Sequence, residues 1–270
     1  MAGFDELLAV EWDQNAVDTF RLNFPDVPVY HGDIAKLSGE RCMELAGIKK
    51  GELDVFDGSP PCQGFSTAGK RKFDDPRNSL FKEYARLLFE LQPKAFVMEN
   101  VTGMVKGCMK QAYLQIIKTL RECGYKAKGE VLNAMYYGVP QSRERVIIIG
   151  FRDDLGIEPS HPKPQTKPGH VIRLDSKPGI YSNRRYGDKI VKDDMTARTI
   201  DKLCRVFWNT KEQWGIKSYI NAASFPASYQ WCGNFVDKKS RIGNSVPPLL
   251  MKAIAEHVKN VLDTKLEAAA

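Results

Sequence analysis

The sequence lacks the long apolar runs and paired ligand motifs that define several classes of protein. No apolar run approaches the roughly 18 residues needed to span a bilayer, and the start of the chain shows no basic-then-apolar signal pattern. The six cysteines include no Cys-x-x-Cys pair, and the four histidines are scattered. This pattern speaks against a zinc site or a disulfide framework. We therefore expect a cytoplasmic protein with no bound metal and no membrane partner.

The charge balance is basic, with a formal net charge of +7. Basic residues cluster in loop-like segments, namely Lys70-Arg71-Lys72, Arg184-Arg185 and Lys238-Lys239-Ser240-Arg241. Such clusters favour a polyanionic partner, because each phosphate that is neutralised releases counterions. The alternative is that a modest basic excess of this kind only keeps the protein soluble.

The order of apolar patterns predicts an α/β fold with a mostly parallel sheet. Short apolar runs at 7–10, 53–56, 95–98 and 146–149 are predicted strands, and 14–23, 79–91, 111–123 and 248–265 are predicted helices. After the strand at 146–149, prolines come close together from Pro159 to Pro178 and the periodicity fades, which predicts a small loop-rich region. We expect a main α/β part over 1–155, a small loop-rich region over 156–215, and a return to the α/β part over 216–270.

One turn carries the strongest chemical signal, Pro60-Pro61-Cys62-Gln63-Gly64-Phe65-Ser66. Proline fixes φ and glycine permits tight turns, so the segment is predicted to hold a thiol on a stiff loop at a strand end. That placement suits a nucleophile. The alternative is a packing cysteine, since free cysteines are among the most buried residues.

Further segments follow in a fixed order: Met98-Glu99-Asn100-Val101, Gln141-Ser142-Arg143-Glu144-Arg145-Val146 and Gly243-Asn244-Ser245-Val246-Pro247-Pro248. Together with the Pro-Cys-Gln turn, they closely resemble the motifs of the DNA cytosine-5 methyltransferase family of bacterial or phage type. The resemblance implies a Rossmann-like, S-adenosylmethionine-dependent fold. It also implies double-stranded DNA as substrate and a role in restriction-modification, with 1–155 and 216–270 forming the catalytic domain and 156–215 the target-recognition region.

The resemblance assigns catalytic roles to Cys62, Glu99, Arg143 and Arg145. Cys62 would add to carbon 6 of cytosine, which makes carbon 5 nucleophilic. Glu99 would bond the cytosine ring, and Arg145 would lie at its O2 near the thiol. On an extended segment the two arginines point to the same side. Glu99 could also be an ordinary strand-end acid, and Arg143 a structural partner of Glu144.

The resemblance also implies a site for the methyl donor and contacts to DNA. For the donor these are Glu11, Trp12, Asp33, Ile34, Asn78, Leu80, Asn244 and Ser245, with the carboxylate of Glu11 suited to a ribose diol and the ring of Trp12 suited to stacking on adenine. Trp12 could instead fill core space. The target base must leave the duplex, and the expected DNA contacts are Gln63, Ser66, Arg184 and Arg185.

The sequence departs from the family pattern at its start. The family's first motif, a strand followed by a Gly-rich loop, has no match, since Met1-Ala2-Gly3-Phe4 resembles the end of the helix after that loop. We therefore expect that a second polypeptide could supply that motif. Two other functions stay open: methylation of cytosine in RNA, and a non-catalytic DNA-binding subunit.

Overall fold

The computed structural model describes residues 2–61, 79–106, 109–165, 179–183, 187–190, 197–200, 205–208 and 215–267. Its centre is a four-stranded sheet in the order β3-β4-β7-β5. β3 pairs with β4 in parallel, whereas β7 runs antiparallel to both β4 and β5. The strands are β3 (Val55–Gly58), β4 (Ala95–Val101), β5 (Tyr125–Asn133) and β7 (Glu144–Arg152).

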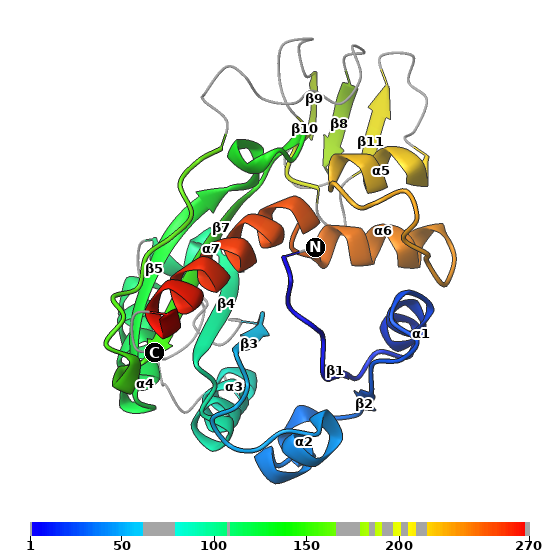
Figure 1. The fold of residues 1–270 in the computed structure, drawn as a ribbon. Helices are drawn as coiled ribbons and strands as arrows, with labels where there is room; N and C mark the ends of the chain where they lie inside the picture. The colour runs from blue at the N-terminus through cyan, green and yellow to red at the C-terminus, as the bar shows by residue number, and fades with distance from the viewer. Residues whose placement is uncertain are drawn as a thin grey trace.

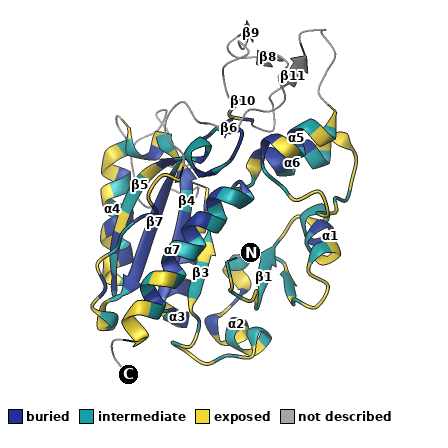
Figure 2. Cartoon of the chain, turned by 45° about the horizontal axis from the view of Figure 1, so that its top comes forward, coloured by how far each residue is buried: buried dark blue, intermediate teal, exposed yellow. Residues whose placement is uncertain are grey.

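Helices cover both faces of this sheet, because alternate residues of its strands point to opposite sides. On one face Phe96 and Ile148 pack with α3 (Ser79–Leu91) and α4 (Lys110–Glu122). On the other face Val97 and Ile149 pack with α7 (Pro248–Glu267). The result is a three-layer α/β sandwich (Figure 1), in which buried residues run along β4 and β7 (Figure 2).

A second, smaller sheet is formed by β1 (Ala9–Glu11) and β2 (Val29–His31), which pair in parallel. Among the described strands these two pair only with each other. Their helices are α1 (Gln14–Asn23), the 3-10 turn η1 (Ile34–Lys36) and α2 (Gly39–Ala46). Leu8 and Val10 pack with Leu87 and Leu91 of α3. Helix α3 therefore contributes to the cores under both sheets.

A small β region lies at the top of the molecule in Figure 1. Its antiparallel sheet has the order β11-β8-β9, and β10 pairs in parallel with β6. The strands are β6 (Gln141–Ser142), β8 (Gly179–Asn183), β9 (Gly187–Ile190), β10 (Ala197–Arg198) and β11 (Arg205–Trp208). This sheet falls inside the region predicted over 156–215, whose boundaries stay a prediction.

Two helices, α5 (Ile216–Ala222) and α6 (Phe235–Asn244), return the chain to the main body. Three further 3-10 turns lie earlier in the chain: η3 (Thr102–Val105), η5 (Ala134–Tyr137) and η6 (Asp153–Leu155). No helix in the described ranges is both long and apolar enough to cross a membrane.

The predicted α/β class is confirmed, with one correction to the sheet. We expected it to be mostly parallel, but β7 runs against both of its neighbours, so the central sheet is mixed. The reason lies in the connection: β5 leads into β7 through the short stretch 134–143, and short connections join antiparallel strands, whereas parallel strands need a long crossover.

Candidate active site

The carboxylate of Glu99 and the guanidinium of Arg145 form the centre of the candidate site. Glu99 faces Ile147 across the antiparallel ladder, and Arg145 faces Val101, so the two charged residues are diagonal neighbours on one face. Arg145 Nε lies 2.6 Å from Glu99 Oε1, and each side chain is only 13% exposed. The N–H does not point along a hydrogen-bond direction to any acceptor in the described structure. We therefore treat the contact as a close ion pair.

The next residue, Asn100, ties this strand to the segment that leads to Cys62. Its side chain is buried, and Nδ2 donates to the carbonyl of Pro60 at 2.9 Å. Its Oδ1 accepts the N–H of Val101 at 2.9 Å. Because Pro60 is also buried, the bond fixes the chain two residues before Cys62. The thiol itself lies outside the described residues.

Arg143 has a different environment from Arg145. Its side chain is 2% exposed, and it donates to the carbonyls of Ile200 at 2.8 Å and Gly243 at 2.9 Å. These bonds join the segment after β10 to the end of α6. The two arginines therefore bond different parts of the chain: Arg145 pairs with Glu99 on β4, whereas Arg143, one residue before β7, bonds the segment after β10 and the end of α6.

Two of the predicted donor residues lie at the carboxyl end of β1. Glu11 Oε1 accepts the N–H groups of Trp12 at 2.8 Å and Asp13 at 3.0 Å, which holds the turn before α1. The Trp12 ring is 80% exposed, so it does not fill core space and offers a face for stacking. His31 at the end of β2 contacts the Trp12 carbonyl at 3.1 Å.

Asp33 and Ile34 lie just beyond β2, next to this turn. Asp33 caps η1 by accepting the Ala35 N–H at 3.0 Å. The Ile34 side chain packs on the core beneath, and Arg86 on α3 donates to the carbonyls of Ile34 at 3.1 Å and Leu37 at 2.8 Å. Because β1 and β2 are parallel, their carboxyl ends share one edge. The structure therefore brings Glu11, Trp12, Asp33 and Ile34 together.

The remaining described donor residues come from two helices. Leu80, in the first turn of α3, is 38% exposed. Asn244 is the exposed last residue of α6. Ser245 caps that helix, with its N–H bonded to the Arg241 carbonyl at 2.9 Å and its Oγ to the Ile242 carbonyl at 2.9 Å.

Several predicted site residues lie outside the described residues and stay predictions: Cys62, Gln63, Ser66, Asn78, Arg184 and Arg185. Two cysteines that the structure describes are poor nucleophiles. Burial raises the pKa of the Cys42 thiol to about 11 and also raises the pKa of Cys123. Both are therefore protonated at neutral pH.

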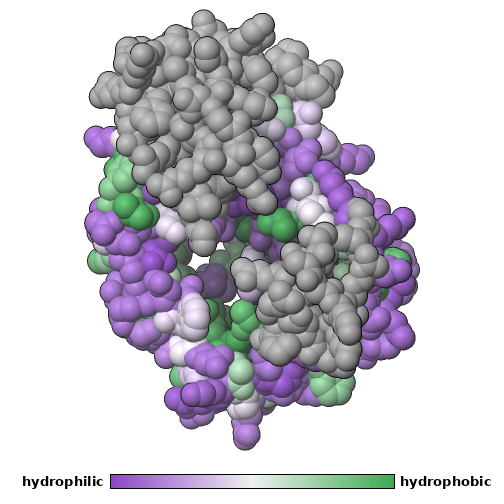
Figure 3. All heavy atoms as spheres, turned by 180° about the vertical axis from the view of Figure 1, so that it is seen from behind, coloured by the Kyte–Doolittle hydropathy of each residue, from purple (hydrophilic) through white to green (hydrophobic). Residues whose placement is uncertain are grey.

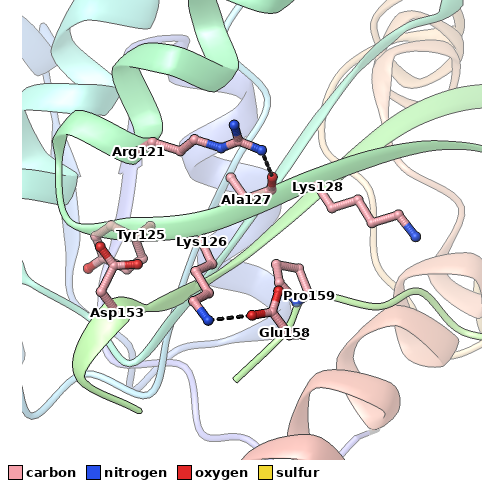
Figure 4. Close-up of a pocket in the computed structure, with 8 residues that line it drawn as sticks. All are labelled: Arg121, Tyr125, Lys126, Ala127, Lys128, Asp153, Glu158 and Pro159. Atoms are coloured by element: carbon pink, nitrogen blue, oxygen red, sulfur yellow. Dashed lines mark hydrogen bonds and ion pairs between the residues drawn. The ribbon is translucent and has the colours of Figure 1, made fainter. Parts of the chain in front are cut away.

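A pocket of about 490 Å³ lies at the other end of the main sheet. Figure 4 shows Arg121, Lys126 and Lys128 along it, with Lys126 paired to Glu158. The ladder places Lys126 beside Phe151, whereas Glu99 sits beside Ile147. The pocket is thus remote from the Glu99–Arg145 pair and is not part of the candidate site.

Sequence reasoning missed three residues that organise the site. Asn100 received no role of its own from the sequence, because its bond to the Pro60 carbonyl joins residues 40 positions apart. Gln141, 1% exposed, bonds the Ala222 carbonyl at 3.2 Å and the Ile200 N–H at 3.0 Å. Arg241 bonds residues more than 220 positions away, and no local pattern could have indicated this.

Comparison with curated proteins gives relatives over nearly the whole chain. The chain is 34% identical over 305 residues to the Type II methyltransferase M1.HphI of Haemophilus parahaemolyticus, with 95% of this chain and 81% of that protein covered. It is 31% identical over 314 residues to the Type II methyltransferase M.Sau96I of Staphylococcus aureus, with 97% and 72% covered.

Solved structures share the fold at low sequence identity. A candidate DNA modification methyltransferase encoded within an E. coli prophage superposes with a TM-score of 0.76 at 20% identity, covering 97% of this chain and 94% of that chain. DNMT2 of Spodoptera frugiperda gives a TM-score of 0.69 at 20% identity, with the same coverage. The family model for C-5 cytosine-specific DNA methylase matches residues 1–221. This chain therefore belongs to the C-5 cytosine-specific DNA methylase family, a family of DNA cytosine methyltransferases.

Proposed function

We propose that this chain transfers a methyl group from S-adenosylmethionine to carbon 5 of cytosine in double-stranded DNA, through a transient bond between Cys62 and carbon 6. Beyond family membership, one observation carries the proposal. Glu99, two residues before the end of β4, pairs with Arg145 of β7, and the adjacent Asn100 bonds the Pro60 carbonyl at 2.9 Å. A base-binding acid, a cation and the start of the cysteine loop thus share one strand end.

Residues of this chain act in each step of the proposed reaction. The Cys62 thiolate attacks carbon 6, and the ring electrons move toward carbon 5 while Glu99 bonds the ring nitrogen. Arg145, a fixed cation beside Glu99, lies at the base's O2 and favours the thiolate over the thiol. S-adenosylmethionine, when bound, would supply the electrophilic methyl group to carbon 5 and leave as S-adenosylhomocysteine once its sulfur–methyl bond is broken. Loss of the carbon 5 proton to solvent then expels the thiolate, which restores the aromatic ring and frees Cys62.

The described donor residues fit an adenosine-containing ligand. The Trp12 face is 80% exposed beside Glu11, and a carboxylate suits a ribose diol. Asp33 adds an exposed carboxylate at the end of the neighbouring strand, with Ile34 as its apolar flank. These side chains would orient the adenosine end, with Leu80, Asn78, Asn244 and Ser245 around the rest of the donor.

The target base has to leave the duplex, because carbon 6 is covered in the base stack. We assign Gln63 and Ser66 to the flipped nucleotide and its gap, and Arg184 and Arg185 to the DNA outside it. Flipping costs a few kcal/mol, which contacts to the extruded base offset. Glu99 and Arg145 are already paired and mostly buried before the base enters, so these two side chains need to move little when it binds.

Trapping on DNA that carries 5-fluorocytosine tests the chemistry directly. Fluorine cannot leave as a cation from carbon 5, so the adduct should persist and join protein and DNA through Cys62. The Cys62→Ser variant should give no such crosslink while keeping DNA binding, and Cys232→Ser serves as a matched control that should crosslink normally. A crosslink that survives in Cys62→Ser would overturn the thiol mechanism. Crosslinking to RNA in place of DNA would overturn the substrate.

We further propose that another polypeptide adds a strand between β1 and β3. Within the described structure each of these parallel strands pairs on one side only, and Figure 3 shows the molecule hollowed near its centre. Glu6 and Asp57 are accessible to solvent, but nearby protein atoms desolvate both carboxyls and raise the pKa of each. The charge of Asp57 raises the pKa of Glu6 further. This environment suits two carboxyls that line a hollow. Exposed strand edges are templates for pairing.

Calorimetry with the methyl donor tests this addition. A peptide with an apolar strand followed by a Gly-rich loop should tighten donor binding by about tenfold or more, equivalent to roughly 1.4 kcal/mol. A peptide of the same composition in scrambled order is the control. Equal donor affinity with both peptides would contradict the added strand without touching the Cys62 chemistry.

A further inference from the structure

A seam of hydrogen bonds joins α1 near the start of the chain to the segment around α6 near its end. Figure 1 shows the two helices side by side. Arg241 Nε donates to Asn15 Oδ1 at 2.7 Å, and its Nη2 donates to Asp13 Oδ1 at 2.6 Å. The Arg241 side chain is 20% exposed. Two acceptors held by one guanidinium fork make a directional contact rather than a loose surface pair.

The seam continues along the length of α1. Asn23 Nδ2 donates to the Gln230 carbonyl at 2.9 Å, and the Gln230 N–H donates back to Asn23 Oδ1 at 2.8 Å. The Cys232 N–H reaches Thr19 Oγ1 at 3.3 Å. At Gly233, whose φ is +85°, an added Cβ would lie 2.4 Å from Asn15 Nδ2. Glycine at this position therefore lets the two segments approach.

This seam has a specific importance because of how the sheets divide. Within the described strands, β1 and β2 have no ladder to the main sheet. The Asp33–Ile34 side of the candidate donor site is held to α3 by Arg86. Among the described residues no hydrogen bond joins Glu11 or Trp12 to α3; this turn is bonded to the β2 side through His31 and Gly32, and to α6 through the seam.

Arg241 links two groups of candidate donor residues, the Glu11–Trp12 turn and Asn244. Asp13, which it bonds, is the N-cap of α1 and accepts the Ala16 N–H at 2.9 Å. The Asp13 N–H in turn bonds Glu11 Oε1 at 3.0 Å. On the other side, Arg241 lies three residues before Asn244 on the same helix. The bond to Arg241 is the largest cause of a lowered Asp13 pKa, so the carboxylate stays charged.

We propose that Arg241 is a positioning residue for the methyl donor, which holds the Glu11–Trp12 turn at a fixed separation from Asn244. This role rests on the proposed function, because it assigns both sides to one donor site. Among the described residues the hydrogen bonds of Arg241 run to Asn15 and Asp13, not to Glu99 or Arg145. Its loss should therefore weaken donor binding while the chemistry at saturating donor stays close to normal.

The test compares Arg241→Gln and Arg241→Lys with the unaltered chain by calorimetry with S-adenosylmethionine. We expect Arg241→Gln to raise the donor Kd about 5- to 20-fold, the equivalent of one or two lost hydrogen bonds. Arg241→Lys should recover part of the affinity, because it keeps the charge but not the fork. Lys252→Gln, which removes an exposed ion pair to Glu256 on α7, is the matched control and should leave Kd unchanged.

A second readout separates positioning from simple stability. DNA affinity and the thermal midpoint are measured on the same variants. The donor Kd should differ by more than twofold between Arg241→Gln and Arg241→Lys, whereas their DNA affinities and thermal midpoints should be similar. A Kd for Arg241→Gln within twofold of the unaltered chain would overturn the role, as would an unaltered chain that binds no donor. Normal donor binding without crosslinking to 5-fluorocytosine DNA would overturn the covalent chemistry and leave this role standing.

Discussion

The ion pair between Glu99 and Arg145 gives the sharpest quantitative test of the site. Arg145 Nε and Glu99 Oε1 are 2.6 Å apart, and each side chain is 13% exposed. With an effective dielectric constant of about 20, two unit charges at this separation attract by about 6 kcal/mol. Desolvation of both ions offsets much of that attraction. We therefore expect a net coupling of about 1–3 kcal/mol, in the upper part of the range of about 0.5–3 kcal/mol seen for residues in direct contact.

A double-mutant cycle with Glu99→Gln, Arg145→Met and the double variant measures this coupling by urea unfolding. Each single variant should lose about 2–4 kcal/mol, since it leaves one charge buried without its partner. The double variant should lose less than the sum. Methyl transfer should fall by roughly 10²-fold in Glu99→Gln, as for a positioned acid–base group.

An exposed pair on the same sheet supplies the control cycle. Lys94 and Asp54 are also 2.6 Å apart, but their side chains are 27% and 51% exposed. Water screens such a pair, so its coupling should be about 0.2–1 kcal/mol. If the Glu99–Arg145 coupling were no larger than that of this control, our reasoning that burial makes the pair special would be refuted.

Three further predictions concern stability. Asn100→Ala leaves the buried Pro60 carbonyl without its donor, so urea unfolding should show a loss of about 1–3 kcal/mol; no loss would contradict a role for this bond. Ser224 has a φ of 63° and caps the first turn of α7 through its hydroxyl, so Ser224→Ala should cost about 0.5–2 kcal/mol and Ser224→Gly, which relaxes the backbone, should cost less; the reverse order would show that strain is absent. Burial lowers the pKa of His161 and His257 below the ordinary 6.5, so the folded chain binds fewer protons than the unfolded chain in acid, and the free energy of unfolding should fall as the pH drops from 6.5 toward about 5; a flat profile would contradict this sign.

Much of the fold could be predicted because local pattern and tertiary packing agree. The predicted helices over 14–23 and 79–91 coincide with α1 and α3, since both carry apolar residues at helical spacing. The strand predicted over 95–98 extends to Val101, because its polar end residues belong to the site rather than the core. No element was predicted over 125–133, although this edge strand β5 alternates between buried and exposed side chains at its start.

The two arginines of one motif show where such prediction ends. Strand alternation applies to Arg145, which lies within β7 and meets Glu99 on the neighbouring strand. Arg143 lies one residue before β7; its carbonyl accepts the Ala134 N–H at 2.9 Å, and its N–H bonds the Asn133 side chain at 3.2 Å. Its guanidinium then bonds carbonyls 57 and 100 residues further along the chain. Those partners exist only after the chain has closed on itself, so spacing within the motif carries no information about them. The same residue type thus serves the proposed chemistry at one position and holds the framework together two residues away.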